Sequence, residues 1–161
     1  ELAMLLMLGA ARHAVAGDRI VRAGAWDSWS PAFMVGKQVT GARLGIIGMG
    51  RVGRAFAAKA RGFDMDVHYY NRSELSSDQA FGATYHETVE SLLGVADFLS
   101  LHCPATPETT NLMNADRLAL LPQGAVIVNT ARGALVDEDA LIAAIETRQV
   151  AAAGLDCFKV A

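Results

Sequence analysis

Short apolar runs alternate with amphipathic segments from Arg43 to the end of the chain. Six runs fit β-strands, the last of them more weakly than the others: 43–47, 66–70, 98–101, 125–129, 151–155 and 83–85. Most are apolar at nearly every position, which is typical of parallel strands covered on both faces. Segments with helical spacing lie between them, at 51–61, 87–94, 115–121 and 137–148. Strand–helix alternation with short connections predicts an α/β fold with a doubly wound parallel sheet.

Particular residues indicate where these helices begin and end. Gly62 follows the first helix and is a candidate C-cap. Pro122 follows the third helix, which it cannot continue. Asp137 and the two acids after it are favoured at the positive start of the fourth helix, and Arg148 is favoured at its negative end. These boundaries therefore do not depend on periodicity alone.

The first 42 residues have a different pattern. An apolar start predicts a buried helix over about 1–16, and a poorly periodic connector follows at 17–41. The apolar run is far shorter than the ~20 residues of a membrane span, and no basic segment precedes it as in a signal peptide. Trp26 and Trp29 favour an ordered connector, because aromatic residues are unusual in flexible linkers. We divide the chain into this leading part, 1–42, and a sheet-forming domain, 43–161.

Composition narrows the class of protein. Of the 161 residues, 52% are hydrophobic and 19% are charged, so the chain can bury a large core. A net charge of −3 and the lack of a basic run argue against a nucleic-acid partner. Cys103 and Cys157 lie far apart, without the neighbouring ligands of a metal site. Two separated thiols favour a reducing compartment, so we expect a cytoplasmic protein with no bound metal and no membrane anchor.

A glycine-rich turn follows the first predicted strand and leads directly into the first predicted helix. Its sequence is G-M-G-R-V-G, with Gly48, Gly50 and Gly53 as the glycines. The first permits a tight turn, the second lets a pyrophosphate approach the backbone, and the third lets the helix pack close to the strand. Backbone N–H groups here, including those of Arg51 and Val52, would hold the phosphates with the helix dipole. A turn without a ligand is the alternative, but the strand before and the helix after favour a dinucleotide-binding domain.

The second predicted strand ends in Asn71, Arg72 and Ser73, about 20 residues after the glycine turn. An NAD site usually has Asp or Glu at this place, which accepts hydrogen bonds from the ribose 2′-OH. Neutral Asn71 removes the repulsion that a carboxylate would exert on a 2′-phosphate, and Arg72 supplies a bidentate donor. This tip favours NADP as the cofactor. The alternative is NAD bound beside a solvated arginine.

Four further motifs follow in order along the chain: Leu101–Thr110, Val128–Gly133, Leu135–Asp137 and Gly154–Asp156. With the glycine turn, they resemble the D-isomer-specific 2-hydroxyacid dehydrogenases over nearly the whole chain. The neutral tip at 71–73 is most similar to the glyoxylate/hydroxypyruvate reductase branch. The resemblance implies a Rossmann-type cofactor domain inserted between two stretches of a substrate domain that is missing here. Since the chain also begins at Glu1 without a methionine, we expect a fragment of a longer protein.

Arg132 follows the strand at 125–129, at the end where open α/β sheets place their ligands. The resemblance implies that it is catalytic and binds the carboxylate and carbonyl of the substrate. A guanidinium suits that task because it is planar, always charged and able to stabilise negative charge growing on the carbonyl oxygen. The alternative is an arginine paired with a surface carboxylate.

The resemblance also implies a set of cofactor contacts beyond the glycine turn. Asp156 resembles a family residue at the nicotinamide end of the cofactor, with a structural N-cap as its alternative. Thr106 and Pro107 could cap a helix. The remaining implied contacts are Cys103 and Pro104 on the adenosine side, Thr109 near the pyrophosphate, and Thr130 and Ala131 beside the catalytic arginine.

The histidines offer no general acid within the chain. His102 follows a strand, but a histidine beside Cys and Pro is more often a packed or capping group. His13, His68 and His86 have no evident partner in the sequence. In the resembled family the acid is a histidine supported by a glutamate, both C-terminal to this segment. The glutamate position falls on Ala161, so the pair either lies beyond the fragment or has been lost.

Two functions remain open at this point. The resemblance favours an oxidoreductase that reduces a small 2-oxo acid, first glyoxylate or hydroxypyruvate, with NADPH or NADH. We expect a homodimer that associates through the leading helix and connector, and a fragment that binds nucleotide without turnover. The alternative is a non-catalytic, dinucleotide-sensing corepressor similar to the C-terminal-binding proteins, which Ala161 would favour. The acidic chain and the tip at 71–73 favour the enzyme.

Overall fold

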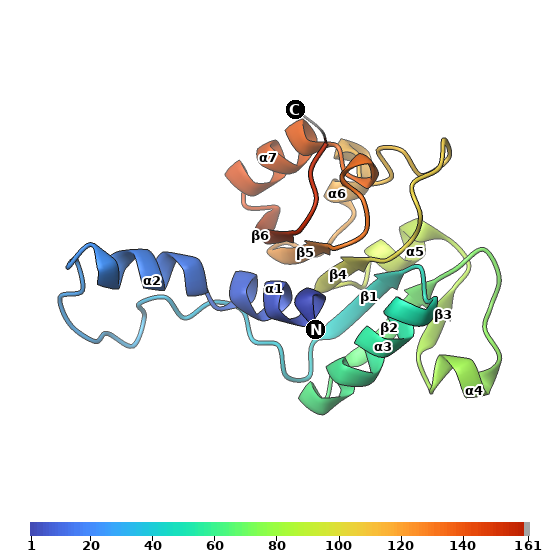
Figure 1. The fold of residues 1–161 in the computed structure, drawn as a ribbon, viewed down its shortest axis with the longest axis horizontal. Helices are drawn as coiled ribbons and strands as arrows, with labels where there is room; N and C mark the ends of the chain where they lie inside the picture. The colour runs from blue at the N-terminus through green and yellow to red at the C-terminus, as the bar shows by residue number, and fades with distance from the viewer. Residues whose placement is uncertain (160–161) are drawn as a thin grey trace.

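One parallel sheet organises the molecule. The computed structural model describes residues 1–159, and six strands within them form a sheet in the order β3-β2-β1-β4-β5-β6 (Figure 1). The strands are β1 (Arg43–Ile47), β2 (Asp66–Tyr70), β3 (Thr84–His86), β4 (Phe98–Leu101), β5 (Ala125–Asn129) and β6 (Val150–Leu155). Every neighbouring pair is parallel. This order is that of the Rossmann-type sheet, and it confirms the predicted fold class.

Two helices precede the first strand, and the others connect the strands or follow them closely. They are α1 (Leu2–Ala11), α2 (Ala14–Arg22), α3 (Arg51–Ala60), α4 (Ser77–Ala80), α5 (Val89–Leu93), α6 (Ala115–Ala119) and α7 (Glu138–Glu146), with the 3₁₀-helices η1 (Arg61–Phe63) and η2 (Gly133–Leu135). The predicted helices between strands are present and slightly shorter than expected. Side chains of Thr88, Asn114 and Asp137 cap α5, α6 and α7 by accepting hydrogen bonds from N–H groups three residues later.

Each face of the sheet has its own apolar core, because successive strand residues point to opposite sides. Ile46, Tyr69 and Val128 belong to the cluster formed with α1 and α3. Leu99 and Ile127 belong to the cluster formed with α5, α6 and α7. Figure 1 shows α3 and α7 on opposite sides of the sheet. Burial on both faces explains why the strands are continuous apolar runs rather than alternating ones.

The single helix predicted over 1–16 is wrong, because the chain forms two helices with a break between them. α1 ends at Ala11, and His13 adopts a left-handed conformation with a φ of 55° before α2 begins. A side chain in this conformation cannot continue a right-handed helix. α2 then carries helical structure to Arg22, within the segment predicted to be a connector.

α1 is buried on one face only, although its sequence is apolar all round. Ala3, Met7 and Ala11 are buried at helical spacing, and α1 packs against β5 and β6. Leu5 on the other face is 67% exposed. The expected buried helix is therefore a half-buried one.

Two predicted helix ends are also wrong. Gly62 is not a C-cap, because α3 runs on into η1 and the left-handed residue that ends this segment is Asp64, with a φ of 53°. Arg148 lies beyond α7 and has a φ of 60°. The sequence reading missed α4, a single turn that is too short to show periodicity.

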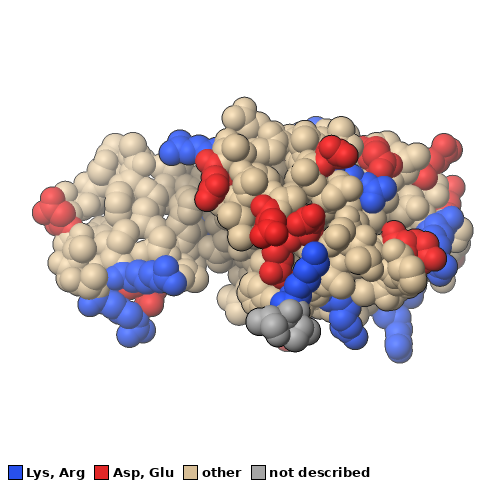
Figure 2. Space-filling model, turned by 90° about the horizontal axis from the view of Figure 1, so that it is seen from above, with Lys and Arg blue, Asp and Glu red and all other residues tan. Residues whose placement is uncertain are grey.

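α2 and the segment after it project from the sheet as an arm, which lies at the left of Figures 1 and 2. Trp29 on this arm is 77% exposed, and Trp26 contacts Phe33 edge-on with 5.6 Å between ring centroids. On the face in Figure 2, Lys and Arg of the described residues are interspersed with Asp and Glu. Among helices in the described range, none has the length and apolar character needed to cross a bilayer.

Candidate functional site

The glycine turn joins β1 to α3, and two of its glycines are required by close contacts. Gly48 has a φ of 96°, and a Cβ there would lie 2.6 Å from the backbone nitrogen of Cys103. A Cβ on Gly53 would lie 2.4 Å from the carbonyl oxygen of Gly48. A Cβ on Gly50, in contrast, would meet nothing within 4 Å. The predicted roles therefore correspond to the geometry: a tight turn, close helix packing, and open space at the middle glycine.

Free backbone donors gather at the start of α3. Within residues 1–159, no hydrogen bond is made by the amide N–H groups of Gly50, Arg51, Val52 and Gly53, whereas Arg54 N–H donates to Gly50 O over 2.9 Å. Unpaired N–H groups at a helix N-terminus, together with the positive end of the helix dipole, favour an anion. The donor set and the open space at Gly50 both fit a dinucleotide pyrophosphate.

Asn71 holds the glycine turn in place, a role that the sequence reading did not assign. Its side-chain Oδ1 accepts a hydrogen bond from the N–H of Met49 over 2.8 Å. The N–H of Gly48 donates to Tyr70 O over 3.0 Å. The end of β2 is therefore tied to the turn by two bonds, and the amide nitrogen of Asn71 keeps its capacity to donate.

A cleft of about 810 Å³ opens where β1 and β4 end, which is the topological switch point of the sheet. Predicted residues that line it are Gly48, Gly50, Asn71, Arg72, Ser73, Cys103, Pro104 and Thr109. The sequence reading missed Arg54, Gln79, Glu108 and Arg117, which also line it. Arg54 could have been found, since it lies on the first turn of the predicted helix. The other three depend on how distant segments meet.

Charge in the cleft is mixed. Arg72 is close enough to Glu108 to contribute to a lowered pKa of that carboxyl, for which a hydrogen bond from Thr106 is the larger cause. Arg117 forms an ion pair with Glu90 at 2.8 Å. Arg54 and Arg72 therefore remain as the cations of this cleft that could meet a phosphate group.

The segment after β4 forms turns rather than a helix, so the helix cap predicted at Thr106 is wrong. N–H groups of Thr109 and Thr110 donate to Thr106 O over 3.1 and 2.9 Å. The Thr109 hydroxyl in turn donates to Pro104 O over 2.8 Å. These bonds keep the cleft wall compact, and burial raises the pKa of the Cys103 thiol beside it.

His102 is a packed group, as predicted. Its Nε2 lies 2.9 Å from Ser100 Oγ, and its ring lies 5.4 Å from that of Phe56. Burial lowers the pKa of His102 to about 4, because desolvation disfavours the charged imidazolium. The imidazole is therefore neutral at physiological pH and supports the wall behind the glycine turn.

Arg132 and Asp156 lie outside this cleft, on the same edge of the sheet. They follow β5 and β6, and both are exposed. Thr130 and Ala131 precede the arginine and are half-buried. Asp156 does not cap a helix in the described part of the chain, because residues 157–159 have no regular structure; its N–H donates to Asn129 O over 3.0 Å. Because β4, β5 and β6 are parallel neighbours, these residues extend the row of ligand-facing ends that starts at the glycine turn.

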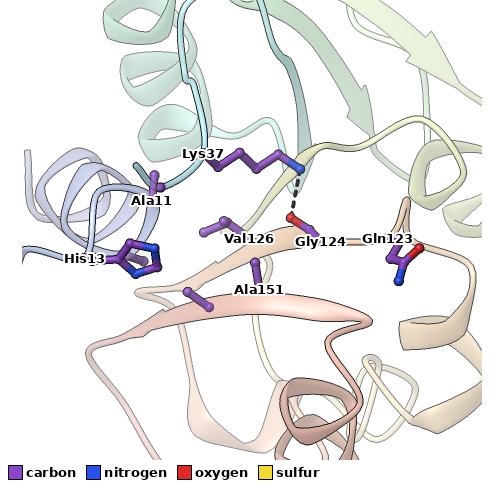
Figure 3. A pocket seen from close by; sticks show the side chains of 10 residues that line it. Ala11, His13, Lys37, Gln123, Gly124, Val126 and Ala151 are labelled. Atoms are coloured by element: carbon purple, nitrogen blue, oxygen red, sulfur yellow. Dashed lines mark hydrogen bonds between the residues drawn. The ribbon is translucent and has the colours of Figure 1, made fainter. Parts of the chain in front are cut away.

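A second cavity, of about 430 Å³, lies at the opposite edge of the sheet, between α1 and the start of β5 (Figure 3). Lys37 reaches into it and donates to Gly124 O over 2.8 Å. Burial lowers the pKa of this lysine, while Asp97 opposes that effect. His13 also lines the cavity. This edge carries the amino ends of the strands, away from the ends where such sheets bind ligands.

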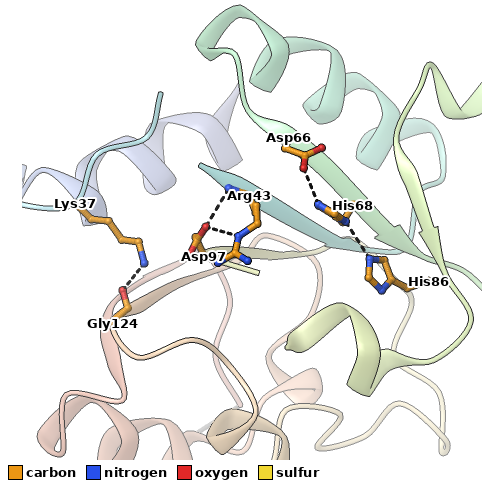
Figure 4. Close-up of polar contacts among 7 residues, drawn as sticks. All are labelled: Lys37, Arg43, Asp66, His68, His86, Asp97 and Gly124. Carbon is orange, nitrogen blue, oxygen red and sulfur yellow. Dashed lines mark hydrogen bonds and ion pairs between the residues drawn. The ribbon is translucent and has the colours of Figure 1, made fainter. Parts of the chain in front are cut away.

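Polar contacts beside the sheet correct one expectation about the histidines (Figure 4). His68 Nδ1 lies 3.0 Å from His86 Nε2, and His68 Nε2 lies 3.0 Å from an oxygen of Asp66. His68 and His86 were expected to lack partners, and that is wrong. The register of β2 and β3 puts His68 opposite Thr84 and His86 opposite Tyr70, so the two histidines are diagonal neighbours on one face of the sheet. Nearby, Arg43 pairs with Asp97 at 2.9 Å, which lowers the pKa of the carboxyl.

Metal ligands do not gather within residues 1–159: no group of three His, Cys, Asp or Glu side chains there could hold an ion. Ala161, at the position of the family's glutamate, lies outside the described residues.

Known proteins of one family are similar to this chain over nearly its whole length. The family described as D-isomer specific 2-hydroxyacid dehydrogenase, NAD binding domain, matches residues 4–161. A glycerate dehydrogenase of Hyphomicrobium methylovorum is 45% identical over 98% of the chain, and a glyoxylate reductase of Pyrococcus horikoshii is 41% identical over 99%. These matches cover 50% and 49% of the relatives, so the chain spans about half their length.

A solved structure has the same arrangement. A Polaromonas chain described by the same family name has a TM-score of 0.96 and 48% identity, covering 98% of this chain and 49% of that one. The matched region, the Rossmann-type sheet and the free donors at the glycine turn all indicate a domain for an NAD(H)-type cofactor. The chain belongs to the D-isomer specific 2-hydroxyacid dehydrogenase family, as its NAD binding domain.

Proposed function

We propose that the whole protein reduces a small 2-oxo acid to the 2-hydroxy acid, with glyoxylate or hydroxypyruvate as the first candidates. The observation that carries the proposal is the row of free N–H groups at Gly50–Gly53, which begins at Gly50 in the wall of a cleft of about 810 Å³. Arg132 lies on the same edge of the sheet. The names of two relatives, glycerate dehydrogenase and glyoxylate reductase, support this class of substrate.

The residues of this chain would divide the work between cofactor and substrate. The N–H groups at the start of α3 would bind the pyrophosphate, and Cys103, Pro104 and Thr109 would line the same cleft. Asp156 would contact the nicotinamide end, as the family resemblance implies. When bound, the dinucleotide supplies the hydride that reduces the carbonyl carbon. The proton would come from a histidine of the family's substrate-side segment.

Arg132 would bind the substrate carboxylate and stabilise the carbonyl oxygen. Its guanidinium is always charged, planar and rich in donors, so it can contact both groups of a 2-oxo acid. Negative charge grows on the carbonyl oxygen during reduction, and a fixed cation beside it favours the transition state over the ground state.

Within the NAD(H)-type cofactors, we favour NADPH. The Oδ1 of Asn71 accepts from Met49 N–H, which directs the neutral amide so that its nitrogen can donate to a phosphate oxygen, and position 71 carries no carboxylate to repel it. Arg72 lines the same part of the cleft and supplies charge. The carboxylate of Glu108 nearby would repel a 2′-phosphate. The preference for NADPH therefore depends on the positive charge of Arg72.

Steady-state kinetics of the full-length protein test the proposal. We expect turnover of glyoxylate or hydroxypyruvate, with a higher kcat/KM for NADPH than for NADH. Arg132→Ala should lower kcat/KM for the acid by about 10²-fold or more, as for other groups that stabilise a developing oxyanion. Lys59→Ala, an exposed cation on α3, is the matched control. Lack of turnover with any short 2-oxo acid would refute the proposal, as would full activity in Arg132→Ala.

We also propose a cytoplasmic homodimer that associates through the arm. Exposed apolar side chains there, such as Val21 at 62% and Trp29 at 77%, favour association. Sedimentation of the protein should give the mass of a dimer, and Trp29→Ser should shift the equilibrium toward the monomer. A monomer at all concentrations would contradict this.

A further inference from the structure

Asn129, the last residue of β5, is buried to 1% exposure and makes two side-chain hydrogen bonds across the turn that follows it. Its Nδ2 donates to Arg132 O over 2.8 Å, and its Oδ1 accepts from Ala131 N–H over 3.0 Å. Its main-chain oxygen accepts from the N–H of Asp156 over 3.0 Å. One buried residue therefore contacts the backbone on both sides of the turn and the end of β6.

This turn determines where the guanidinium of Arg132 lies. The residue has extended dihedral angles, φ −148° and ψ 139°, at the N-cap of η2, where its carbonyl oxygen accepts the Asn129 bond and also a bond from Leu135 N–H over 3.2 Å. Apart from the bond between Nη1 and Ala131 O, the side chain is exposed. Its direction therefore follows from a backbone that the Asn129 side chain holds on both sides of Ala131, together with the first bond of η2.

Only an amide of this length meets both requirements of the turn. It must donate to a carbonyl and accept from an N–H at once, which a carboxylate cannot do and a serine hydroxyl is too short to do. Glutamine would add a methylene group within a packed core. The chemistry of the turn thus selects asparagine.

We propose that Asn129 is a positioning residue for the reaction: it orients Arg132 and, through its main-chain oxygen, the segment that bears Asp156. This inference rests on the proposed function, because the role of Arg132 is given there. The contact with Asp156 N–H is made by the main chain and is kept in side-chain variants, and Asn129 does not line the dinucleotide cleft, so we expect these variants to act through Arg132 rather than on dinucleotide binding.

A double-mutant cycle in the full-length protein tests the inference. Asn129→Ala and Asn129→Asp are each made in two backgrounds, one with the wild-type Arg132 and one with Arg132→Lys. For every variant, kcat/KM for the 2-oxo acid and the Kd for NADPH are measured. Asn114→Ala is the matched control, because Asn114 also caps a backbone N–H, over 3.0 Å, but at α6. In Asn129→Asp, a protonated carboxyl can donate again, so its kcat/KM should recover toward wild type as pH falls.

We expect Asn129→Ala to lower kcat/KM by about tenfold or more beside Arg132 but by less than about threefold beside Arg132→Lys, with the Kd unchanged within about threefold. Equal losses in both backgrounds, a parallel loss of NADPH binding, or full activity would overturn the inference. If the variants do not fold, hydrogen exchange of Ala131 N–H in the wild type decides: protection supports the inference, and exchange at the free-peptide rate overturns it. Absence of turnover in the wild type would refute the proposed function instead. The exchange of Ala131 N–H would then still show whether Asn129 holds the turn.

Discussion

Alanine at two glycines of the same turn should have different effects: Gly48→Ala should destabilise the fold, whereas Gly50→Ala should weaken dinucleotide binding. Gly48→Ala places a Cβ 2.6 Å from Cys103 N and 2.7 Å from His102 C, both of them backbone atoms. The positive φ of 96° costs about 1–2 kcal/mol in an alanine, and overpacking against backbone costs about 1–3 kcal/mol more. We therefore expect Gly48→Ala to lower the free energy of unfolding by about 2–5 kcal/mol.

Gly50→Ala should leave the protein folded. Gly50 has a φ of −78°, which any residue can adopt, and its added Cβ would meet nothing within 4 Å. Losing a glycine N-cap costs a few tenths of a kcal/mol or more, and the stiffer unfolded chain offsets part of this, so the net change should be within about 1 kcal/mol. The methyl group does project into the space where we propose the pyrophosphate binds. The Kd for NADPH should rise by about tenfold or more, or about 1.4 kcal/mol.

Urea unfolding followed by circular dichroism gives the stability, and calorimetric titration gives the Kd. Gly124→Ala is the control for backbone strain, because Gly124 has a φ of 76° but no atom within 4 Å of an added Cβ. It should cost about 1–2 kcal/mol and leave the Kd unchanged. Wild-type stability in Gly48→Ala, or wild-type NADPH binding in Gly50→Ala, would refute this reasoning about the turn.

Three further perturbations test other parts of the account. The folded pKa of His102, about 4, lies below its ordinary value of 6.5, so its contribution to stability is complete above about pH 6.5 and is lost as pH falls toward 4. The loss of unfolding free energy between pH 7 and pH 4 should be about 3 kcal/mol greater in the wild type than in His102→Gln, as measured by urea unfolding at each pH. An equal dependence of stability on pH in the two proteins would contradict this. Asn71→Asp keeps the acceptor for Met49 N–H but adds a charge that repels a 2′-phosphate, so the Kd for NADPH should rise by about tenfold while that for NADH does not. Met7→Ala should lower the unfolding free energy by about 2–5 kcal/mol, whereas Leu5→Ala, at 67% exposure, should change it by less than about 1, as unfolding curves would show.

The sheet and the glycine turn could be predicted because they depend on local signals. Buried parallel strands are apolar throughout, so their runs stand out, and the order of motifs shows where each strand ends. Gly48 and Gly53 are needed for close backbone approaches that recur in this type of turn. Such features require no knowledge of distant contacts.

The missed features depend on how distant segments meet. The His68–His86 pair needs the register of β3, a three-residue strand whose pairing no periodicity reveals. Asn71 was assigned to the ribose, yet its Oδ1 bonds Met49, a contact set by the turn's three-dimensional path. The break at His13 has no glycine or proline to signal it. In each case the local sequence contains no signal of the contact or the break.

Amide chemical-shift mapping on an isotope-labelled protein titrated with NADPH tests the central claim most directly. The account predicts that the largest shifts occur at the N–H groups of Gly50, Arg51 and Val52, which lack partners within the described residues. Shifts centred instead on the cavity around Lys37, with these amides unmoved, would contradict it.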